Sequence, residues 1–256
     1  MLLVAMSARR PPAYPEIIAH RCGGAHAPEN TLAGLRAAAA LGVKGVEFDV
    51  MLCGDGTPVL IHDETLERTT DGHGRVAQTP LEHLRRLDAG RWFDVRFAGE
   101  PLPTFAEAAR LCRELGLWAN VEIKPAAGFE VDTGVAVARL ARHFWPAGEG
   151  VLLSSFSLPS LMAARDAAPE LPRAVLLERV SPAWRQHLED TGSLAVHVDW
   201  RKLTRAQATE IGAAGVPLAC YTVNAPETAA RLRALGVVAF FSDTPERLRK
   251  ALSDEG

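Results

Sequence analysis

The chain has 256 residues, of which 48% are hydrophobic and 23% are charged, and its formal net charge is −3. These values are typical of a globular protein that is long enough for one large α/β barrel or for two smaller domains. The Lys and Arg residues are scattered, and without a basic stripe to neutralise successive phosphates the sequence does not predict nucleic-acid binding.

The N-terminus and the cysteines indicate a reducing, cytoplasmic compartment. The first residues, M-L-L-V-A-M-S-A-R-R-P-P, place arginines after a short apolar run, the reverse of the order in a signal peptide. No segment is long enough to cross a membrane, and the four cysteines form no C-x-x-C pair. We therefore expect a cytoplasmic protein without stable membrane association and with a flexible leader over residues 1–15. The sequence does not indicate an oligomeric state.

Short apolar, β-branched runs alternate with segments of helical spacing along the chain. Eight runs are expected to be strands: Ile17–His20, Gly45–Val50, Trp118–Lys124, Val151–Phe156, Arg173–Leu177, Leu194–Trp200, Val216–Val223 and Val237–Ser242. Eight segments are expected to be helices: Leu32–Leu41, Phe105–Leu115, Val131–Phe144, Leu158–Ala168, Pro182–Thr191, Thr204–Ala214, Pro226–Leu235 and Pro245–Leu252. This repeated order predicts a (β/α)₈, or TIM, barrel that forms one domain over residues 1–256.

Glycines and polar residues mark the expected helix ends. Gly42, Gly116, Gly215 and Gly236 each follow a helix and precede a strand, where glycine can adopt the left-handed conformation that ends a helix. Asn30 and Thr31 are expected to cap the first helix, and Asn224 is expected to cap the helix that begins near Pro226.

The interval from about residue 51 to residue 104 breaks this rhythm. It is rich in turn signals, such as G-D-G-T-P at 54–58 and D-G-H-G at 71–74, so we expect a small insertion after the second strand. Because barrel enzymes build their sites from loops at the C-terminal ends of the strands, the insertion is expected to cover the site. The run Pro58–Ile61 is expected to form a hairpin strand that points His62 toward it.

Three carboxylates are expected to meet at the mouth of the barrel. Glu47 and Asp49 are two residues apart on the second strand, so their side chains share a face. The same spacing on the third strand places Asn120, Glu122 and Lys124 together and brings Glu122 beside the first pair. Such a cluster raises the pKa values of its own members unless a cation neutralises them. Oxygen ligands suit one hard divalent cation, Mg²⁺, Ca²⁺ or Mn²⁺.

Four further residues would complete a site for phosphodiester hydrolysis. Arg21 offers a planar fork and Lys124 a point charge for phosphate oxygens. His20 and His62 are suited to move protons near neutral pH, and the sequence does not separate the acid from the base. Taken singly, E-x-D and H-D motifs are most often solvated polar positions, and it is their coincidence at three strand ends that favours catalysis.

Other positions leave two readings open. Phe156 and Tyr221 lie at strand ends and are read either as contacts for a substrate or as core aromatics. His197 and Asp199 share a face of the sixth strand and are read either as lining the pocket or as hydrogen-bonded core residues. The Cys22 thiol, beside Arg21, is read either as acidified or as a small loop residue, and the second reading is favoured.

The motifs together resemble one family over Ile17 to about Leu252. The strings are H-R-x-G…P-E-N-T, E-F-D, G-x-P-V-L-I-H-D-E-T-L-E-R-T-T-D-G with one extra residue before its proline, N-V-E-I-K, Y-T-V-N and F-S-D-T-P. They are similar to those of the glycerophosphodiester phosphodiesterases, which are TIM barrels of the phosphatidylinositol-phospholipase-C-like type. The resemblance implies a divalent cation and hydrolysis of small-molecule glycerophosphodiesters to glycerol 3-phosphate and an alcohol. It implies catalytic roles for His20 and His62, metal ligation by Glu47, Asp49 and Glu122, and phosphate contacts by Arg21 and Lys124.

The chain departs from the family pattern at two positions. Cys22 stands where the family usually has glycine, and is expected either to narrow the site or to require a negative φ. Tyr221 stands where tryptophan is usual, so substrate preference is expected to differ. The rival readings are a lysophospholipase D-like or phosphoinositide-cleaving phospholipase of the same fold, and a non-catalytic phosphate-binding barrel.

Overall fold

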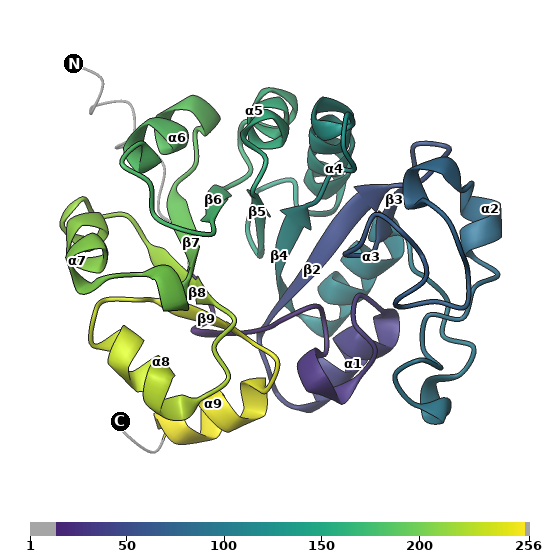
Figure 1. The fold of residues 1–256 in the computed structure, drawn as a ribbon, viewed down its shortest axis with the longest axis horizontal. Coiled ribbons are helices and arrows are strands. Elements are labelled where there is room, and N and C mark those ends of the chain that lie inside the picture. The colour runs from purple at the N-terminus through teal and green to yellow at the C-terminus, as the bar shows by residue number, and fades with distance from the viewer. Residues whose placement is uncertain (1–13, 254–256) are drawn as a thin grey trace.

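Eight parallel strands close into a barrel at the centre of the computed structural model, which describes residues 14–253 (Figure 1). The strands are β1 (Ile17–Ala19), β2 (Gly45–Leu52), β4 (Trp118–Ile123), β5 (Val151–Ser155), β6 (Arg173–Leu177), β7 (Ala195–Asp199), β8 (Leu218–Tyr221) and β9 (Ala239–Ser242). Each pairs with the next, and β1 pairs with both β9 and β2, which closes the ring. The expected TIM barrel is confirmed.

Helices surround the barrel on its outer side (Figure 1). They are α1 (Leu32–Ala40), α3 (Phe105–Leu115), α4 (Glu130–Phe144), α5 (Leu158–Ala167), α6 (Trp184–Thr191), α7 (Arg205–Ala213), α8 (Pro226–Arg233) and α9 (Pro245–Ser253). Helices α4 and α5 approach closely because Gly134 has no side chain, and a Cβ there would lie 2.4 Å from the Ser160 carbonyl oxygen. Apolar side chains between the strands and these helices form the main core.

Local signals fix the ends of several helices. Thr31 caps α1 by accepting a hydrogen bond from the Gly34 amide, and Thr104 forms a capping box with Glu107 at α3. At the other ends, the glycines expected to stop helices all have positive φ: Gly42, Gly116, Gly215 and Gly236. The sequence therefore sets the element boundaries largely through short-range contacts.

The insertion begins two residues later than expected, because β2 continues through Leu52. It contains β3 (Pro58–Leu60), which pairs antiparallel with the end of β2, and the short helix α2 (Leu81–Leu84). A small apolar cluster that includes Val59, Leu66 and Leu84 holds the insertion against the barrel. The expected hairpin strand is confirmed, and it delivers the next residues, 61–63, to the mouth.

The N-terminal end of the barrel is closed by residues that the sequence assigned to the flexible leader. The Tyr14 ring packs 5.5 Å from that of Trp118, and its hydroxyl lies 2.8 Å from His197 Nε2. Tyr14 and Pro15, the last two residues of the expected leader, are packed against the barrel. The rest of the expected leader, residues 1–13, lies outside the described residues.

A helix needs about 20 predominantly apolar residues to cross a bilayer. Within residues 14–253, no helix combines the length and the apolar character needed for this.

Candidate active site

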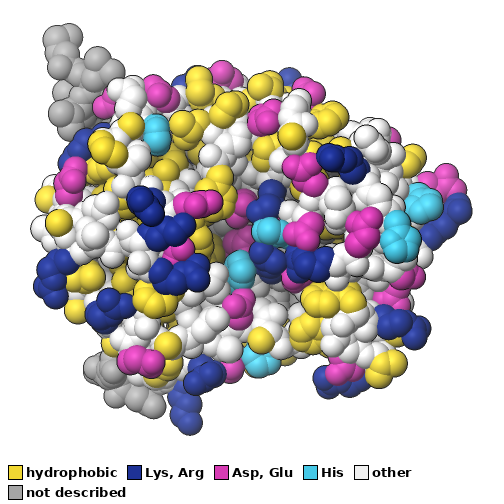
Figure 2. All heavy atoms as spheres, in the orientation of Figure 1, with side chains coloured by type: hydrophobic (Ala, Val, Ile, Leu, Met, Phe, Trp, Pro, Cys, Tyr) yellow, Lys and Arg dark blue, Asp and Glu magenta, His cyan; other side chains and the backbone are white. Residues whose placement is uncertain are grey.

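A cavity of about 260 Å³ opens at the C-terminal ends of the strands. Its lining comprises His20, Arg21, Glu47, Asp49, His62, Asn120, Glu122, Lys124, Phe156, Leu176, Arg201, Tyr221, Thr222 and Phe241. Figure 2 shows acidic, basic and histidine side chains gathered around this hollow near the centre of the face drawn. The structure thus brings together all nine residues singled out from the sequence as site residues.

Three carboxylates lie in the floor of the cavity because of the register between β2 and β4. Glu47 of β2 pairs with Asn120 of β4, and Asp49 pairs with Glu122, so the inward-facing side chains of the two strands lie side by side. Glu47, Asp49 and Glu122 are at most 9% exposed, and one oxygen from each lies within 4.8 Å of the others. This all-oxygen set could hold a divalent cation.

Burial opposes ionisation of this triad, and the outcome differs among the three. For Glu47, burial and the charges of Asp49 and Glu122 raise the pKa well above its usual value. Burial and the charge of Asp49 raise the pKa of Glu122 to about 7. Burial also opposes ionisation of Asp49, but Lys124, His62 and Arg21 outweigh it and lower the pKa. The expected mutual pKa elevation therefore holds for two of the three acids. A cation would complete the neutralisation of the cluster.

Two side chains brace Asp49 directly. Asn30 Nδ2 donates to Asp49 Oδ2 at 2.8 Å, and the Asp49 amide donates to Asn30 Oδ1 at 3.0 Å. Lys124 Nζ lies 3.5 Å from Asp49 Oδ1 and 3.3 Å from Glu122 Oε1. The expectation that Asn30 caps a helix is wrong, because Thr31 is the cap and Asn30 instead fixes one of the acids.

Arg21 is held in the loop after β1 by three acidic groups. Its amide donates to Glu47 Oε2 at 2.7 Å, its Nη1 donates to Glu29 Oε1 at 2.9 Å, and its Nε lies 3.8 Å from Asp49 Oδ2. Arg21, Cys22 and Asn30 all have positive φ, which non-glycine residues rarely adopt. The loop thus has an unusual backbone, from which Arg21 lines the cavity.

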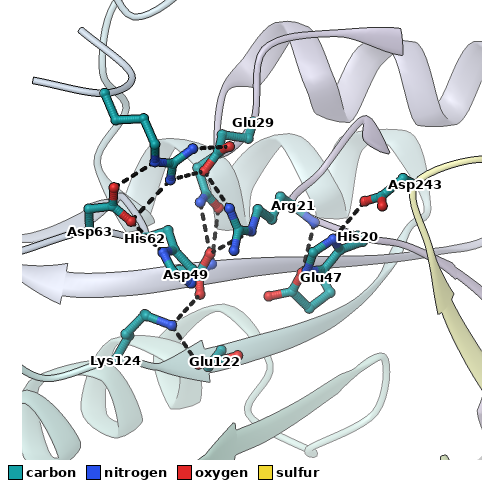
Figure 3. A network of polar contacts seen from close by, with 12 residues as sticks. His20, Arg21, Glu29, Glu47, Asp49, His62, Asp63, Glu122, Lys124 and Asp243 are labelled. Carbon is teal, nitrogen blue, oxygen red and sulfur yellow. Dashed lines mark hydrogen bonds and ion pairs between the residues drawn. The ribbon is translucent and has the colours of Figure 1, made fainter. Parts of the chain in front are cut away.

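Both histidines are fixed by a carboxylate on the same ring nitrogen (Figure 3). His20 Nδ1 lies 2.8 Å from Asp243 Oδ1, and His62 Nδ1 lies 2.6 Å from Asp63 Oδ1. An ionised carboxylate only accepts hydrogen bonds, so each Nδ1 carries the proton and each Nε2 is left for the cavity. Burial lowers the pKa of His62, with Lys124 adding to the effect and Asp49 opposing it.

Asp243 is itself oriented by Asn224. The Asn224 amide group donates to Asp243 Oδ2 at 2.9 Å and accepts from the Asp243 backbone at 2.8 Å. The expectation that Asn224 caps a helix is therefore also wrong, since Ala225 precedes α8 and no side chain caps it.

The side of the cavity facing these groups is mainly apolar. Phe156 is 45% exposed, and its ring packs edge-on against that of Tyr221, with 6.0 Å between the ring centroids. The Tyr221 hydroxyl donates to the Leu177 carbonyl at 2.9 Å, so the ring is held in place. Arg201, paired with Asp199 at 2.9 Å, is the basic group on this side of the lining.

The structure decides the two readings of His197 and of Cys22. His197 is fully buried and does not line the cavity, and burial lowers its pKa to about 3, so it is a neutral core residue. Cys22 has a φ of 74°, which contradicts the expected negative φ, and its side chain is buried in the main core. It therefore does not narrow the cavity, and burial raises its pKa rather than lowering it.

Two buried polar atoms of the lining have no hydrogen-bond partner within residues 14–253: Arg21 Nε and Asn120 Oδ1. The first is a donor and the second an acceptor, and a buried polar group without a partner is costly. Asn120 Nδ2 donates to Ser154 Oγ at 2.9 Å, which holds the side chain in place.

Several supporting residues were not identified from the sequence. Glu29, Asp63 and Arg68 form a charged group beside the cavity, and Asp243 holds His20. Asp63 follows His62 directly, so the H-D pair carried a local signal for its role. The Glu29–Arg68 contact joins residues 39 positions apart, and no local pattern marks it.

Relatives of the chain are found among phosphodiesterases. Residues 20–247 match the model of the glycerophosphoryl diester phosphodiesterase family. A glycerophosphodiester phosphodiesterase of Caldanaerobacter subterraneus is 35% identical, over 91% of this chain and 95% of its own. A solved phosphodiesterase of Oleispira antarctica, in complex with its product sn-glycerol-3-phosphate, is 38% identical with a TM-score of 0.90. That match covers 93% of this chain and 97% of the other. A solved enzyme of Agrobacterium tumefaciens is 27% identical, with a TM-score of 0.75, over 92% and 99% of the two chains.

These matches, together with a barrel whose mouth combines acidic, basic and histidine side chains, define a phosphoric diester hydrolase. The match to the family model spans most of the chain, and a relative above 30% identity covers nearly all of it. The chain belongs to the glycerophosphoryl diester phosphodiesterase family.

Proposed function

We propose that the protein hydrolyses glycerophosphodiesters to glycerol 3-phosphate and an alcohol, with His20 and His62 moving the protons. The observation that carries this proposal is that both imidazoles have a carboxylate on Nδ1 and line the same cavity as the acidic triad. One imidazole, in its neutral form, accepts the proton of the attacking oxygen on Nε2. The other, protonated on both nitrogens, donates its Nε2 proton to the departing alkoxide. The attacking oxygen belongs either to water or to a glycerol hydroxyl, through a cyclic phosphate.

We further propose that Glu47, Asp49 and Glu122 hold one divalent cation, Mg²⁺, Ca²⁺ or Mn²⁺. The oxygen donor set and the raised pKa values of Glu47 and Glu122 support it. When bound, such a cation supplies positive charge to the phosphate oxygens. Arg21 and Lys124 also line the cavity and add donors for the phosphate oxygens.

Phe156 and Tyr221 form the wall against which the substrate packs in this proposal. The edge-on contact between their rings and the bond from Tyr221 to Leu177 hold the wall rigid. We also propose that the barrel and its insertion act as a single domain, because β3 continues the sheet and the insertion's apolar cluster includes Met51 of β2.

The test is a screen of glycerophosphodiesters with different head groups, with and without a chelator. We expect glycerol 3-phosphate to be released, the chelator to abolish release, and added divalent cation to restore it. Faster turnover of lysophosphatidylcholine than of glycerophosphocholine would support a phospholipase instead. If no glycerophosphodiester releases glycerol 3-phosphate with any of the three cations, the proposal is wrong.

His62→Ala tests the proton-transfer role separately from metal binding. We expect turnover to fall by about 10²–10⁴-fold, because a positioned acid or base contributes about that much. Metal affinity, measured by calorimetry, should change little, since His62 is not one of the three acids. The matched control is His83→Ala, which removes an exposed histidine of the insertion. Near-normal turnover of His62→Ala would contradict the assigned role.

A further inference from the structure

Arg68 lies in the insertion and binds two carboxylates with the two edges of its guanidinium. Its Nε and Nη2 donate to Asp63 Oδ2 and Oδ1 at 2.6 and 3.1 Å. Its Nη1 and Nη2 donate to Glu29 Oε2 and Oε1 at 2.7 and 2.8 Å. Both contacts are therefore bidentate, the geometry in which arginine binds carboxylates most strongly. Arg68 itself is not among the residues that line the cavity.

Each of these carboxylates also holds a residue of the cavity. Asp63 Oδ1, which accepts from Arg68, is the atom 2.6 Å from His62 Nδ1. Glu29 Oε1, which also accepts from Arg68, is the atom that receives Arg21 Nη1 at 2.9 Å. The dashed lines at Asp63 and Glu29 in Figure 3 mark these contacts. One guanidinium is thus joined to two cavity residues through two shared oxygens.

We propose that Arg68 is a positioning residue that fixes His62 and Arg21 at the same time, through Asp63 and Glu29. The inference rests on the roles proposed above for His62 in proton transfer and for Arg21 in phosphate contact. It assigns Arg68 no contact with substrate or metal.

The physical reason is that two ionised carboxylates lie beside each other and share one cation. Hydrogen bonds from Arg68 lower the pKa of Asp63. Burial opposes ionisation of Glu29, but the hydrogen bonds from Arg68 together with the charges of Arg21 and Arg68 outweigh it, so the pKa of Glu29 is also lowered. Without Arg68 the two anions repel, and each can turn toward solvent and release the cavity residue it holds. Lysine could supply the charge but not the two planar edges, because its ammonium is a single point donor.

The two contacts predict different kinetic effects when each is weakened alone. Asp63→Asn disturbs the imidazole that moves a proton, so it should mainly lower kcat. Glu29→Gln disturbs the guanidinium that contacts phosphate, so it should mainly raise KM. Arg68→Ala should do both, with kcat/KM falling by about 10–100-fold, the loss typical of a lost supporting partner or a small misplacement. Arg68→Lys should recover part of this loss.

The matched control is Arg85→Ala. Arg85 also lies in the insertion, is similarly exposed at 51% against 43% for Arg68, and pairs with one carboxylate, Glu107, at 2.6 Å. Glu107 belongs to the capping box of α3 and does not line the cavity, so kcat and KM should stay within about 2-fold of wild type, as for ordinary exposed pairs. If Arg68→Ala behaves like Arg85→Ala, the inference is wrong.

A second measurement separates positioning from general loss of structure. Nitrogen NMR of histidine-labelled, metal-free protein reports which ring nitrogen of His62 carries the proton. We expect the Nδ1–H form in wild type and in Arg85→Ala, and a mixture in Arg68→Ala, whose circular dichroism should match wild type. An unchanged His62 signal in Arg68→Ala would overturn the inference. The inference would also fail if the loss of activity in Arg68→Ala only followed a loss of folded protein and Arg68→Lys did not restore activity.

The outcomes also distinguish this inference from the proposed function. Absence of turnover in wild type would reject the proposed function whatever Arg68 does. Active wild type and inactive His62→Ala, combined with normal kcat and KM for Arg68→Ala, would reject the positioning role alone.

Discussion

Replacing Glu122 by glutamine should make the metal-free protein more stable near neutral pH, although it removes a proposed metal ligand. Burial and the charge of Asp49 raise the pKa of Glu122 from 4.5 to about 7, so the folded state disfavours its ionised form. The protonated Glu122 carboxyl therefore favours the folded state. Its contribution to the free energy of unfolding is fully present below about pH 4.5 and is lost as the pH rises through about 7. Above that pH, the buried charge is a net cost to folding.

The size of the effect follows from the difference between the two pKa values. Each pKa unit corresponds to about 1.4 kcal/mol, so an ionised Glu122 costs about 3 kcal/mol at pH 8. Glutamine keeps the shape without the charge but loses the 3.3 Å ion pair with Lys124. We therefore expect Glu122→Gln to raise the free energy of unfolding by about 1–3 kcal/mol at pH 8 and by much less at pH 4.5.

The assay is urea denaturation in the presence of a chelator at pH 4.5 and pH 8. The matched control is Glu149→Gln, which removes an exposed carboxylate from the loop before β5 and should change stability little at either pH. Added divalent cation should reverse the order, stabilising wild type more than Glu122→Gln. If Glu122→Gln is no more stable than wild type at pH 8 without metal, the assigned electrostatic cost is wrong.

Three further predictions concern the loop and the wall of the cavity. Asn30→Ala removes both hydrogen bonds to Asp49, so the free energy of unfolding should fall by about 2–4 kcal/mol. Calorimetry should also show weaker cation binding, and an unchanged cation affinity would contradict the bracing role. The buried Cys22 thiol should react with a thiol reagent only after denaturation, and rapid labelling of native protein at this residue would refute its placement. Tyr221→Phe loses one bond, to the Leu177 carbonyl, so kcat should stay within about 3-fold of wild type; a loss above 10-fold would assign the hydroxyl a larger role.

The barrel and the meeting of the proposed site residues in one cavity could be predicted because both depend on short periods in the sequence. Alternating positions on a strand share a face, so their spacing alone places Glu47 with Asp49. Parallel strands end at one edge, which brings Glu122 to the same place. The element ends follow from caps and glycines that act over a few residues.

The supporting contacts could not be predicted in the same way, because they depend on which distant segment meets a polar side chain. Asn30 and Asn224 have the local features of helix caps, and both instead hydrogen-bond a carboxylate 19 residues away. Packing brings Tyr14 against His197, a contact across 183 residues that no motif marks. Local propensity identified the two asparagines as polar ends of elements, and tertiary structure determined their partners.

The cavity is assembled from two parts of the chain that come one after the other. The acids, Arg21, Lys124 and both histidines lie within residues 20–124, whereas the facing wall is supplied by strands β5 to β9. Substitutions in this wall can therefore reshape the cavity without moving a proposed catalytic group, as long as Asp243 and Asn224, which hold His20, are kept. For redesign, this makes positions 156, 176, 201 and 221 natural sites for a focused library, with the first half of the chain held constant.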